Sequence, residues 1–170
     1  MKNEIIFSEK QYFRQWWLWL IILGIDGLFL YGFTQQIILG KPFGDRPLSN
    51  AGLFVFLFVC IGITWLFLSI RLETFIKKDG IYVRLFPFHA ALKHYHWDQL
   101  QKVYVRQYAP IKEYGGWGLR SGWGGNNQAY NISGDMGLQL EFSDGKKLLI
   151  GTSKPEQLTA CLNTLQQWKS

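Results

Sequence analysis

The residue types best suited to bind another molecule are concentrated in residues 114–125, a glycine- and tryptophan-rich segment. Half of its residues are glycine, which permits backbone conformations that other residues rarely adopt. Its aromatic side chains offer flat apolar surface, and its arginine offers a two-pronged hydrogen-bond donor. The expected surface for a ligand or partner contains this segment and the strand after it: Tyr114, Gly115, Gly116, Trp117, Gly118, Arg120, Trp123, Tyr130 and Asn131.

The same segment has a second interpretation as architecture. A long loop between strands can fold its tryptophans back onto the domain, and the sequence leaves this alternative open. A phosphate-binding loop is excluded, because no Gly-Lys-Ser/Thr sequence accompanies the glycines.

No set of residues in the sequence indicates catalysis. The chain contains no Gly-x-Ser-x-Gly motif and no evident pair of carboxylates, since the acidic residues of its second half fit turns or loops. We therefore expect a protein that is not an enzyme. The competing hypothesis is a small enzyme, or an enzyme subunit, with Arg120, Tyr130 or a histidine in its site.

Two histidines, His94 and His96, fall on one face of an expected strand, and His89 is close to them in the sequence. Two imidazoles on a strand bind zinc only with a further ligand, and no cysteine is near them in the sequence. We expect no metal site and no cofactor.

The net charge of +6 resides mainly in the second half of the chain. Residues 71–170 contain 13 basic and 8 acidic residues, a balance of +5, whereas residues 1–70 contain 5 basic and 4 acidic residues. The positive charges are scattered and no recognisable motif accompanies them, so no nucleic-acid partner is expected. The candidates for facing anionic lipid are the basic residues that flank the first expected hairpin of the domain, Lys77, Lys78 and Arg84.

Two apolar runs precede this domain. Residues 51–70 contain no charge, and residues 16–33 contain only Asp26. About twenty helical residues cross the ~30 Å hydrocarbon core of a bilayer. The pattern predicts an N-terminal arm and a two-helix transmembrane hairpin within residues 1–71, followed by a cytoplasmic domain in residues 72–170. The predicted spans are about 15–34 and about 51–70.

The N-terminal arm and the flanking charges refine this hairpin. Residues 8–11 read as a capping box, so the first helix is expected to begin before the bilayer. Lysine and arginine are more frequent in the arm and after the second run than in the connecting loop. This asymmetry places both termini and the domain on the cytoplasmic side.

A carboxyl group inside the first apolar run calls for a partner, because a charged carboxylate near mid-bilayer costs about 2.5–3.5 kcal/mol. In an antiparallel hairpin, Asp26 lies near the level of Thr64. Gly24, Gly27 and Gly62 would let the helices approach closely. We expect a neutral Asp26 bonded to Thr64 or to a second copy of the chain. A small transport or assembly factor built around Asp26 is the alternative.

Short strand patterns follow the hairpin, and a helical pattern closes the chain. Strands are expected at residues 73–77, 81–86, 91–97, 101–108, 137–142 and 147–151. Residues 153–156 read as a capping box, and the apolar residues after them recur at helical spacing. The expected domain is mainly β, an antiparallel barrel or sandwich of about six or seven strands capped by a C-terminal helix.

This order of strands and final helix resembles a pleckstrin-homology-like (PH-like) domain. In particular, residues 114–120, 129–134, 137–145 and 149–158 resemble those of bacterial membrane proteins that carry a PH-like domain behind two transmembrane helices. The Gly-Gly-Trp-Gly-x-Arg sequence that ends at Arg120 is the most specific part. The resemblance covers essentially the whole chain and implies fold and location, but no catalytic residue.

Together these patterns predict a multi-pass protein of the bacterial inner membrane. Its expected function is that of a membrane-anchored PH-like binding or adaptor module, which recognises a protein or an anionic lipid through the glycine- and tryptophan-rich segment. Its expected partners are the lipid bilayer, a membrane or cytoplasmic protein, and further copies of the chain.

Overall fold

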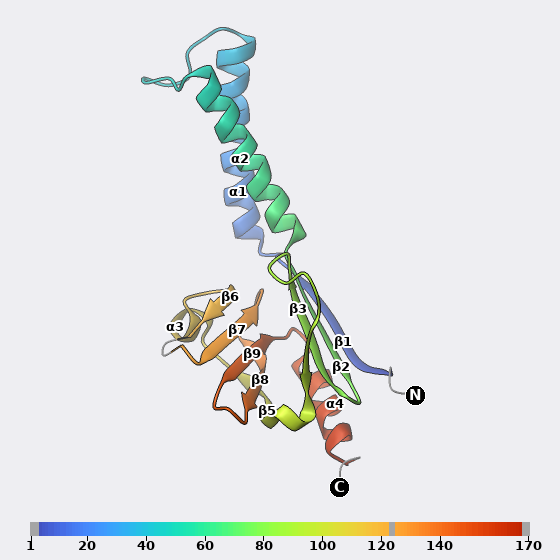
Figure 1. The fold of residues 1–170 in the computed structure, drawn as a ribbon. Coiled ribbons are helices and arrows are strands. Elements are labelled where there is room, and N and C mark those ends of the chain that lie inside the picture. Colours follow the sequence, from blue (N-terminus) through green and yellow to red (C-terminus); the bar gives the residue numbers. More distant parts are fainter. Residues whose placement is uncertain (1–3, 123–124, 168–170) are drawn as a thin grey trace. The chain divides into compact units, whose positions relative to one another are not determined.

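The computed structural model describes residues 4–122 and 125–167, and the chain forms two compact units (Figure 1). One unit is residues 14–69. The other joins the N-terminal arm, up to residue 13, to residues 70–170. The sequence grouped this arm with the hairpin, whereas in the structure it is part of the globular unit.

The hairpin unit contains two long helices, α1 (Trp16–Phe33) and α2 (Asn50–Ser69), and a π-helical turn, η1 (Thr34–Ile38), continues α1. Both helices are long and apolar enough to cross a membrane, by length and composition. Their bounds lie close to the predicted spans. Only 11% of each apolar window is buried, so most of its side chains face away from the rest of the chain.

The two helices do not pack through the glycines that the sequence singled out. A Cβ atom added at Gly24, Gly27 or Gly62 would meet nothing within 4 Å. Aromatic rings fill the contact instead, such as Phe29 against Phe56, whose ring centroids are 5.3 Å apart. The expectation of close helix approach at these glycines was therefore wrong, because no atom of the other helix lies against them.

The N-terminal arm is the first strand of a four-stranded antiparallel sheet, ordered β1-β2-β3-β4. The strands are β1 (Ile5–Tyr12), β2 (Arg71–Lys77), β3 (Gly80–Phe86) and β4 (Lys93–His96). The capping box expected at residues 8–11 was wrong, since these residues lie within β1. The sequence of residues 8–11 favours the start of a helix, but these residues pair with β2 instead. This pairing forms although some sixty residues separate the two strands.

A second sheet has five strands in the order β5-β8-β9-β7-β6. They are β5 (Leu100–Gln107), β6 (Gly118–Ser121), β7 (Asn127–Asn131), β8 (Met136–Phe142) and β9 (Lys147–Gly151). A 3-10 turn, η2 (Trp97–Gln99), connects β4 to β5, and a short helix, α3 (Pro110–Tyr114), follows β5.

Two expectations about the sheets need correction. The described residues contain nine strands rather than six or seven, because the arm supplies β1 and the glycine-rich region supplies β6 and β7. The second sheet is mixed rather than antiparallel, since β7 runs parallel to β9. A parallel neighbour needs a crossover in the chain, which the alternation of short strands does not reveal.

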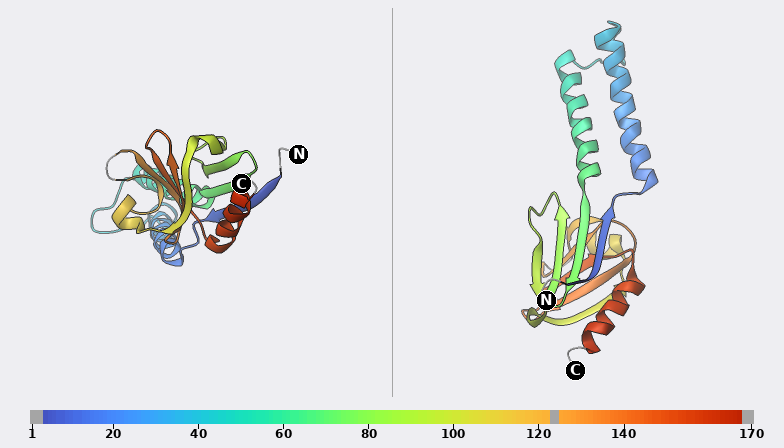
Figure 2. Two further views of the ribbon diagram at one scale, coloured as in Figure 1. Left: turned by 90° about the horizontal axis from the view of Figure 1, so that it is seen from below. Right: turned by 90° about the vertical axis from the view of Figure 1, so that its right-hand side faces the viewer.

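The core of the globular unit lies on the inner face of the four-stranded sheet and under the last helix, α4 (Pro155–Gln167), which packs against β1 and β5 (Figure 2). Alternation puts Leu72, Ile76 and Val83 in this core, with no exposed surface. The stripe predicted for α4 is confirmed at Leu158, Cys161, Leu162 and Leu165, which are all buried.

The start of α4 differs from the capping box expected at residues 153–156. The hydroxyl of Ser153 donates to the Glu9 carboxylate at 2.6 Å, and the first helical hydrogen bond runs from Leu158 N to Lys154 O. Thr152 also donates to Glu9, at 2.6 Å. The Ser153 hydroxyl, expected to cap α4, is therefore bound to the buried Glu9 carboxylate on β1. These hydrogen bonds connect the N-terminal arm to the residues that follow β9.

Candidate functional site

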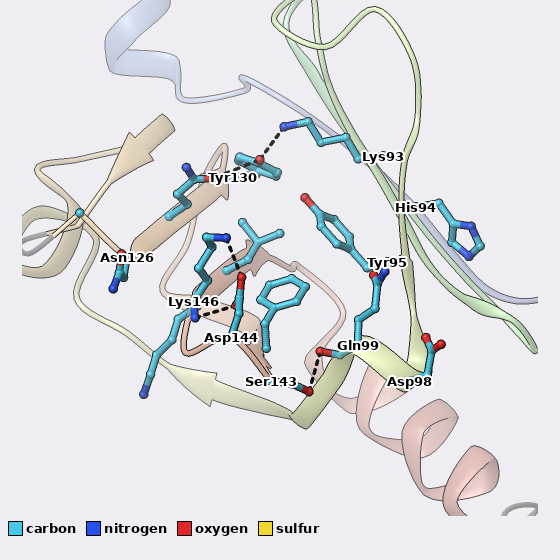
Figure 3. A pocket seen from close by; sticks show the side chains of 15 residues that line it. Lys93, His94, Tyr95, Asp98, Gln99, Asn126, Tyr130, Ser143, Asp144 and Lys146 are labelled. Carbon is cyan, nitrogen blue, oxygen red and sulfur yellow. Dashed lines mark hydrogen bonds and ion pairs between the residues drawn. The ribbon is translucent and has the colours of Figure 1, made fainter.

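A cavity of about 650 Å³ lies between β4 of the first sheet and the β7 and β8–β9 region of the second (Figure 3). Volumes of this order are typical of ligand sites. Its lining includes three lysines, two aspartates, two tyrosines and several amides: Lys93, Tyr95, Asp98, Gln99, Asn126, Gln128, Tyr130, Asp144, Lys146 and Lys147.

The register of β4 explains why its polar side chains enter the cavity. Lys93 is opposite Val83, and Tyr95 is opposite Ile81. Both partners on β3 are fully buried, so their side of the sheet is the inner one. Because side chains alternate along a strand, Lys93 and Tyr95 point toward the second sheet.

The ammonium group of Lys93 contacts only neutral groups among its described hydrogen-bond and ring partners. Its Nζ donates to the Tyr130 hydroxyl at 2.9 Å and lies 5.2 Å from the centroid of the same ring. Within residues 4–122 and 125–167, no carboxylate forms an ion pair with Lys93, whereas Lys146 and Lys147 pair with acidic neighbours. Lys93 therefore retains an uncompensated positive charge at the cavity wall.

A buried histidine, His89, packs against the ring of Tyr130. The rings of His89 and Tyr130 meet edge to face, with centroids 4.8 Å apart. His89 Nδ1 accepts a hydrogen bond from Leu85 N at 3.2 Å, which requires an unprotonated nitrogen. Burial lowers the pKa of His89, and the nearby charge of Lys93 lowers it further. His89 is therefore neutral, and it adds no second charge to the cavity.

The hydroxyl group of Tyr95 stays protonated. Burial raises the pKa of Tyr95, and its neighbour Tyr130 raises it further through charge interaction and hydrogen bonding. A neutral phenol beside an ammonium group gives hydrogen-bond donors without a base or nucleophile. This combination suits the binding of an anionic group, such as a carboxylate or a phosphate.

Several polar groups of the glycine- and tryptophan-rich segment, and of the strand after it, form hydrogen bonds inside the domain. Tyr114 is buried and its hydroxyl donates to Asn127 Oδ1 at 3.0 Å. Asn131 has no exposed surface, and it accepts from Gly118 N at 2.9 Å and donates to the Tyr108 hydroxyl at 3.0 Å. Gly115 ends α3 in the left-handed conformation, with φ of 69°, where other residues are strained.

Trp117 and Arg120 are among the side chains of the segment that reach solvent. Trp117 is half-buried and its Nε1 donates to Gly134 O at 3.1 Å. Arg120 is exposed and its Nε donates to Trp117 O at 2.9 Å. Trp123 lies outside the described residues. Of the described members of the predicted set, only Tyr130 lines the cavity, and Gly125 at the end of the segment lines it too.

The basic residues expected to face lipid are separated along the first sheet. Lys77 and Lys78 stand at the β2–β3 turn, where Lys78 pairs with Glu4 at 2.7 Å and Lys77 lies over the Tyr82 ring. Arg84 lies toward the other end, where its Nε donates to Glu73 at 2.8 Å. These three residues therefore do not form one surface patch.

The polar pair expected in the hairpin is in contact. Thr64 Oγ1 donates to Asp26 Oδ2 at 2.6 Å. This bond joins α1 to α2 at the level that the antiparallel hairpin predicted.

The two strand histidines contact each other with tilted rings. The ring centroids of His94 and His96 are 3.8 Å apart at an interplanar angle of 48°, whereas His94 stacks on Tyr82 with centroids 4.0 Å apart. In the part of the chain that the structure describes, no group of three or more His, Cys, Asp or Glu side chains is placed to hold a metal ion.

Comparison with known proteins identifies one family. No curated protein and no solved structure matches the chain. The model of a family of unknown function, DUF6141, matches residues 2–165, which is nearly the whole sequence. The chain therefore belongs to this family, DUF6141.

Proposed function

We propose that this protein is a membrane-anchored, non-catalytic binding module, whose globular unit holds an acidic segment of a partner protein at the cytoplasmic face of a bacterial inner membrane. The observation that carries the proposal is Lys93, a cation without a carboxylate partner among the described residues, at the wall of a cavity of ligand size. Neutral donors around it can orient an incoming carboxylate.

Membrane anchoring is supported by the hairpin and by the pairing of the strands that flank it. Each helix has the length and composition of a membrane span. Tyr12 of β1 pairs with Arg71 of β2, so the chain entering the hairpin and the chain leaving it lie on the same side. The lysine and arginine bias assigns that side to the cytoplasm.

A PH-like fold is supported by the order of the elements. Four antiparallel strands are followed by the antiparallel set β5, β8 and β9, and then by the C-terminal helix. The hairpin is an insertion between β1 and β2, and α3, β6 and β7 are an insertion between β5 and β8. Without these two insertions, seven antiparallel strands and a final helix remain, which supports the proposed PH-like fold.

A protein segment fits the cavity better than a bilayer lipid does. The cavity extends from Lys93 along β4 to Gln99 and to Ser143 in the β8–β9 turn. The Gln99 end lies beyond His96, which pairs with Gly80 near the β2–β3 turn. This end is opposite the one at which β1 and β2 lead into the helices, which favours a protein segment over a bilayer lipid as the occupant.

Site-specific photo-crosslinking in native membranes tests the proposal. A benzophenone amino acid at Gln99, in the full-length chain, is expected to give a discrete protein adduct. Thr159, exposed on α4, is the control position and is expected to give none. Lys93→Gln should remove the adduct, whereas Lys93→Arg, which keeps the charge, should retain most of it. An adduct that is unchanged in Lys93→Gln contradicts the proposal, and a lipid adduct at Gln99 would assign the cavity to lipid.

Membrane topology has a separate test. Cysteines are introduced at Ser49, in the hairpin loop, and at Gln157, on α4. In cells with a permeabilised outer membrane and an intact inner membrane, an impermeant thiol reagent should modify the first cysteine and not the second. Reaction at Ser49 alone supports the orientation. Equal reaction at both positions, or reaction at Gln157 alone, is incompatible with it.

A further inference from the structure

One end of the first sheet is tied to both long helices by very short lengths of chain. Tyr12, Arg71 and Phe86 are neighbours across β1, β2 and β3 at this end. Tyr12 precedes the first residue of α1, Trp16, by four positions, and Arg71 follows the last residue of α2, Ser69, by two. A chain spans at most about 3.6 Å per residue, so this end lies within about 15 Å of both helix ends, whatever the orientation of the sheet.

The β3–β4 loop, residues 87–92, leaves the sheet at the same end, directly after Phe86. Its two large apolar side chains are exposed, Phe88 by 51% and Leu92 by 42%. His89, between them, is buried and is held by two hydrogen bonds with Leu85. The loop is therefore fastened through His89 while Phe88 and Leu92 remain in solvent.

A group of cations stands on the outer face of the sheet near this loop. Lys10, Arg71 and Arg84 surround the Glu73 carboxylate, whose side chain is only 4% exposed. Arg71 also lies over the Phe86 ring, 4.6 Å from its centroid. One carboxylate balances one of the three cations, so two positive charges remain in excess beside the exposed apolar loop.

We propose that this end of the sheet docks on the anionic surface of the membrane in which the hairpin is anchored. Phe88 and Leu92 enter the interfacial region, and the excess charge of the Lys10–Arg71–Arg84 cluster attracts the phosphate groups of acidic phospholipids. The inference rests on the proposed membrane anchoring. It also moves the lipid contact away from Lys77 and Lys78, which lie about 20 Å further along the strands.

Fluorescence quenching in vesicles tests this docking with the full-length chain. A polarity-sensitive fluorophore is attached at Phe88→Cys, and the native cysteines, Cys60 and Cys161, are both buried. Vesicles contain phosphatidylglycerol and phosphatidylcholine, with a nitroxide on a fraction of the headgroups. Two further labels serve as references: Phe58→Cys, on α2, with a nitroxide on the acyl chains, and Lys78→Cys, at the β2–β3 turn.

The expected result is a blue-shifted emission and a strong loss of fluorescence at position 88, with little loss at position 78. Quenching at position 58 shows that the hairpin is inserted. If position 58 is quenched and position 88 is not, the docking inference is overturned while anchoring stands. If position 78 is quenched as strongly as position 88, docking through this end is also overturned. If position 58 is not quenched, membrane anchoring itself fails, and the docking falls with it.

A charge series tests the cluster separately. The quenching at position 88 should weaken when phosphatidylglycerol is omitted, and it should weaken in Lys10→Gln, whose side chain is half exposed. Lys78→Gln removes the same charge at the other end of the strands and should leave the quenching unchanged. Equal losses in the two variants would show that only the net charge of the domain matters, which overturns the assignment to this cluster.

Discussion

The glycine- and tryptophan-rich segment and the cavity wall on β4 use similar residue types for different purposes. In the segment and in the strand after it, Tyr114 and Asn131 direct their polar atoms toward other parts of the protein and are buried. On the cavity wall, Lys93 and Tyr95 direct theirs toward an open volume of about 650 Å³. The comparison teaches that residues of unusual composition can be hydrogen-bonded inside the domain, while an ordinary lysine and tyrosine on a short strand face an open cavity.

The strongest test of this difference is Asn131→Ala. The variant leaves the N–H of Gly118 and the hydroxyl of Tyr108 without their present partner inside the domain. We expect the free energy of unfolding to fall by about 2–3 kcal/mol. Chemical denaturation of the purified chain in detergent measures it. Gln128→Ala, at an exposed position of the same strand on the cavity side, is the matched control and should change stability by less than about 0.5 kcal/mol. An Asn131→Ala variant with wild-type stability would remove the architectural assignment.

A smaller effect is expected at Trp117 and Arg120, two side chains of the segment that reach solvent. Trp117→Phe keeps an aromatic ring and loses the hydrogen bond to Gly134 O, so it should cost about 1 kcal/mol of stability. Arg120→Ala should cost less than about 0.5 kcal/mol, because the side chain is exposed. Neither variant should reduce the photo-adduct at Gln99 beyond its folded fraction. A loss of adduct in folded Arg120→Ala would return the site to this segment.

The two regions should also respond to different ranges of pH. Burial, and then the charge of Lys93, lowers the pKa of His89 in the folded state. A lowered pKa contributes stability above the unfolded value of about 6.5, and this stability is lost as the pH falls through the folded pKa. The cavity side should therefore loosen in mild acid. Lys93→Gln should raise the pKa of His89, measured by its ring resonances in a pH titration, and an unchanged pKa would show that the two side chains do not interact.

The smallest effect is expected at Glu113, at the start of the glycine-rich region. A hydrogen bond from Arg106 lowers the pKa of Glu113, and a second one from Ala109 N lowers it further. Burial raises this pKa but does not outweigh the two hydrogen bonds. The stability contributed by Glu113 is present above its unfolded pKa of about 4.3 and is lost as the pH falls through the folded value. Its side chain is 34% exposed, so screening keeps the effect small. Amide exchange in α3 should rise only in this lower range, and a rise near pH 6 would contradict the assignment.

Several elements were predictable because their signals are local. The two long helices follow from uninterrupted apolar runs, and α4 follows from apolar residues at helical spacing. Six of the strands follow from alternation and turn residues. The hydrogen bond between Asp26 and Thr64 could also be predicted, because the geometry of an antiparallel hairpin determines which residues of the two helices lie side by side.

The candidate site was less accessible, because it depends on which face of a strand is buried. Alternation put Lys93 and Tyr95 on one face of β4 and His94 on the other, but both faces carry polar and aromatic groups. Pairing with Val83 and Ile81 decides which face points inward. Asn126 and Tyr130 reach the same cavity only through the parallel pairing of β7 with β9.

The sequence by itself determined the two apolar helices, the mainly β character of the rest and the helix that closes the chain. These depend on the periodicity and composition of neighbouring residues, which act over a few turns or strand positions. The tertiary structure alone decided that the N-terminal arm is a strand, that Glu9 takes the hydroxyl of Ser153, and that Lys93 faces a cavity. Each of these joins residues far apart in the chain, and their pairing is selected by burial and hydrogen bonding in the assembled domain rather than by local preference.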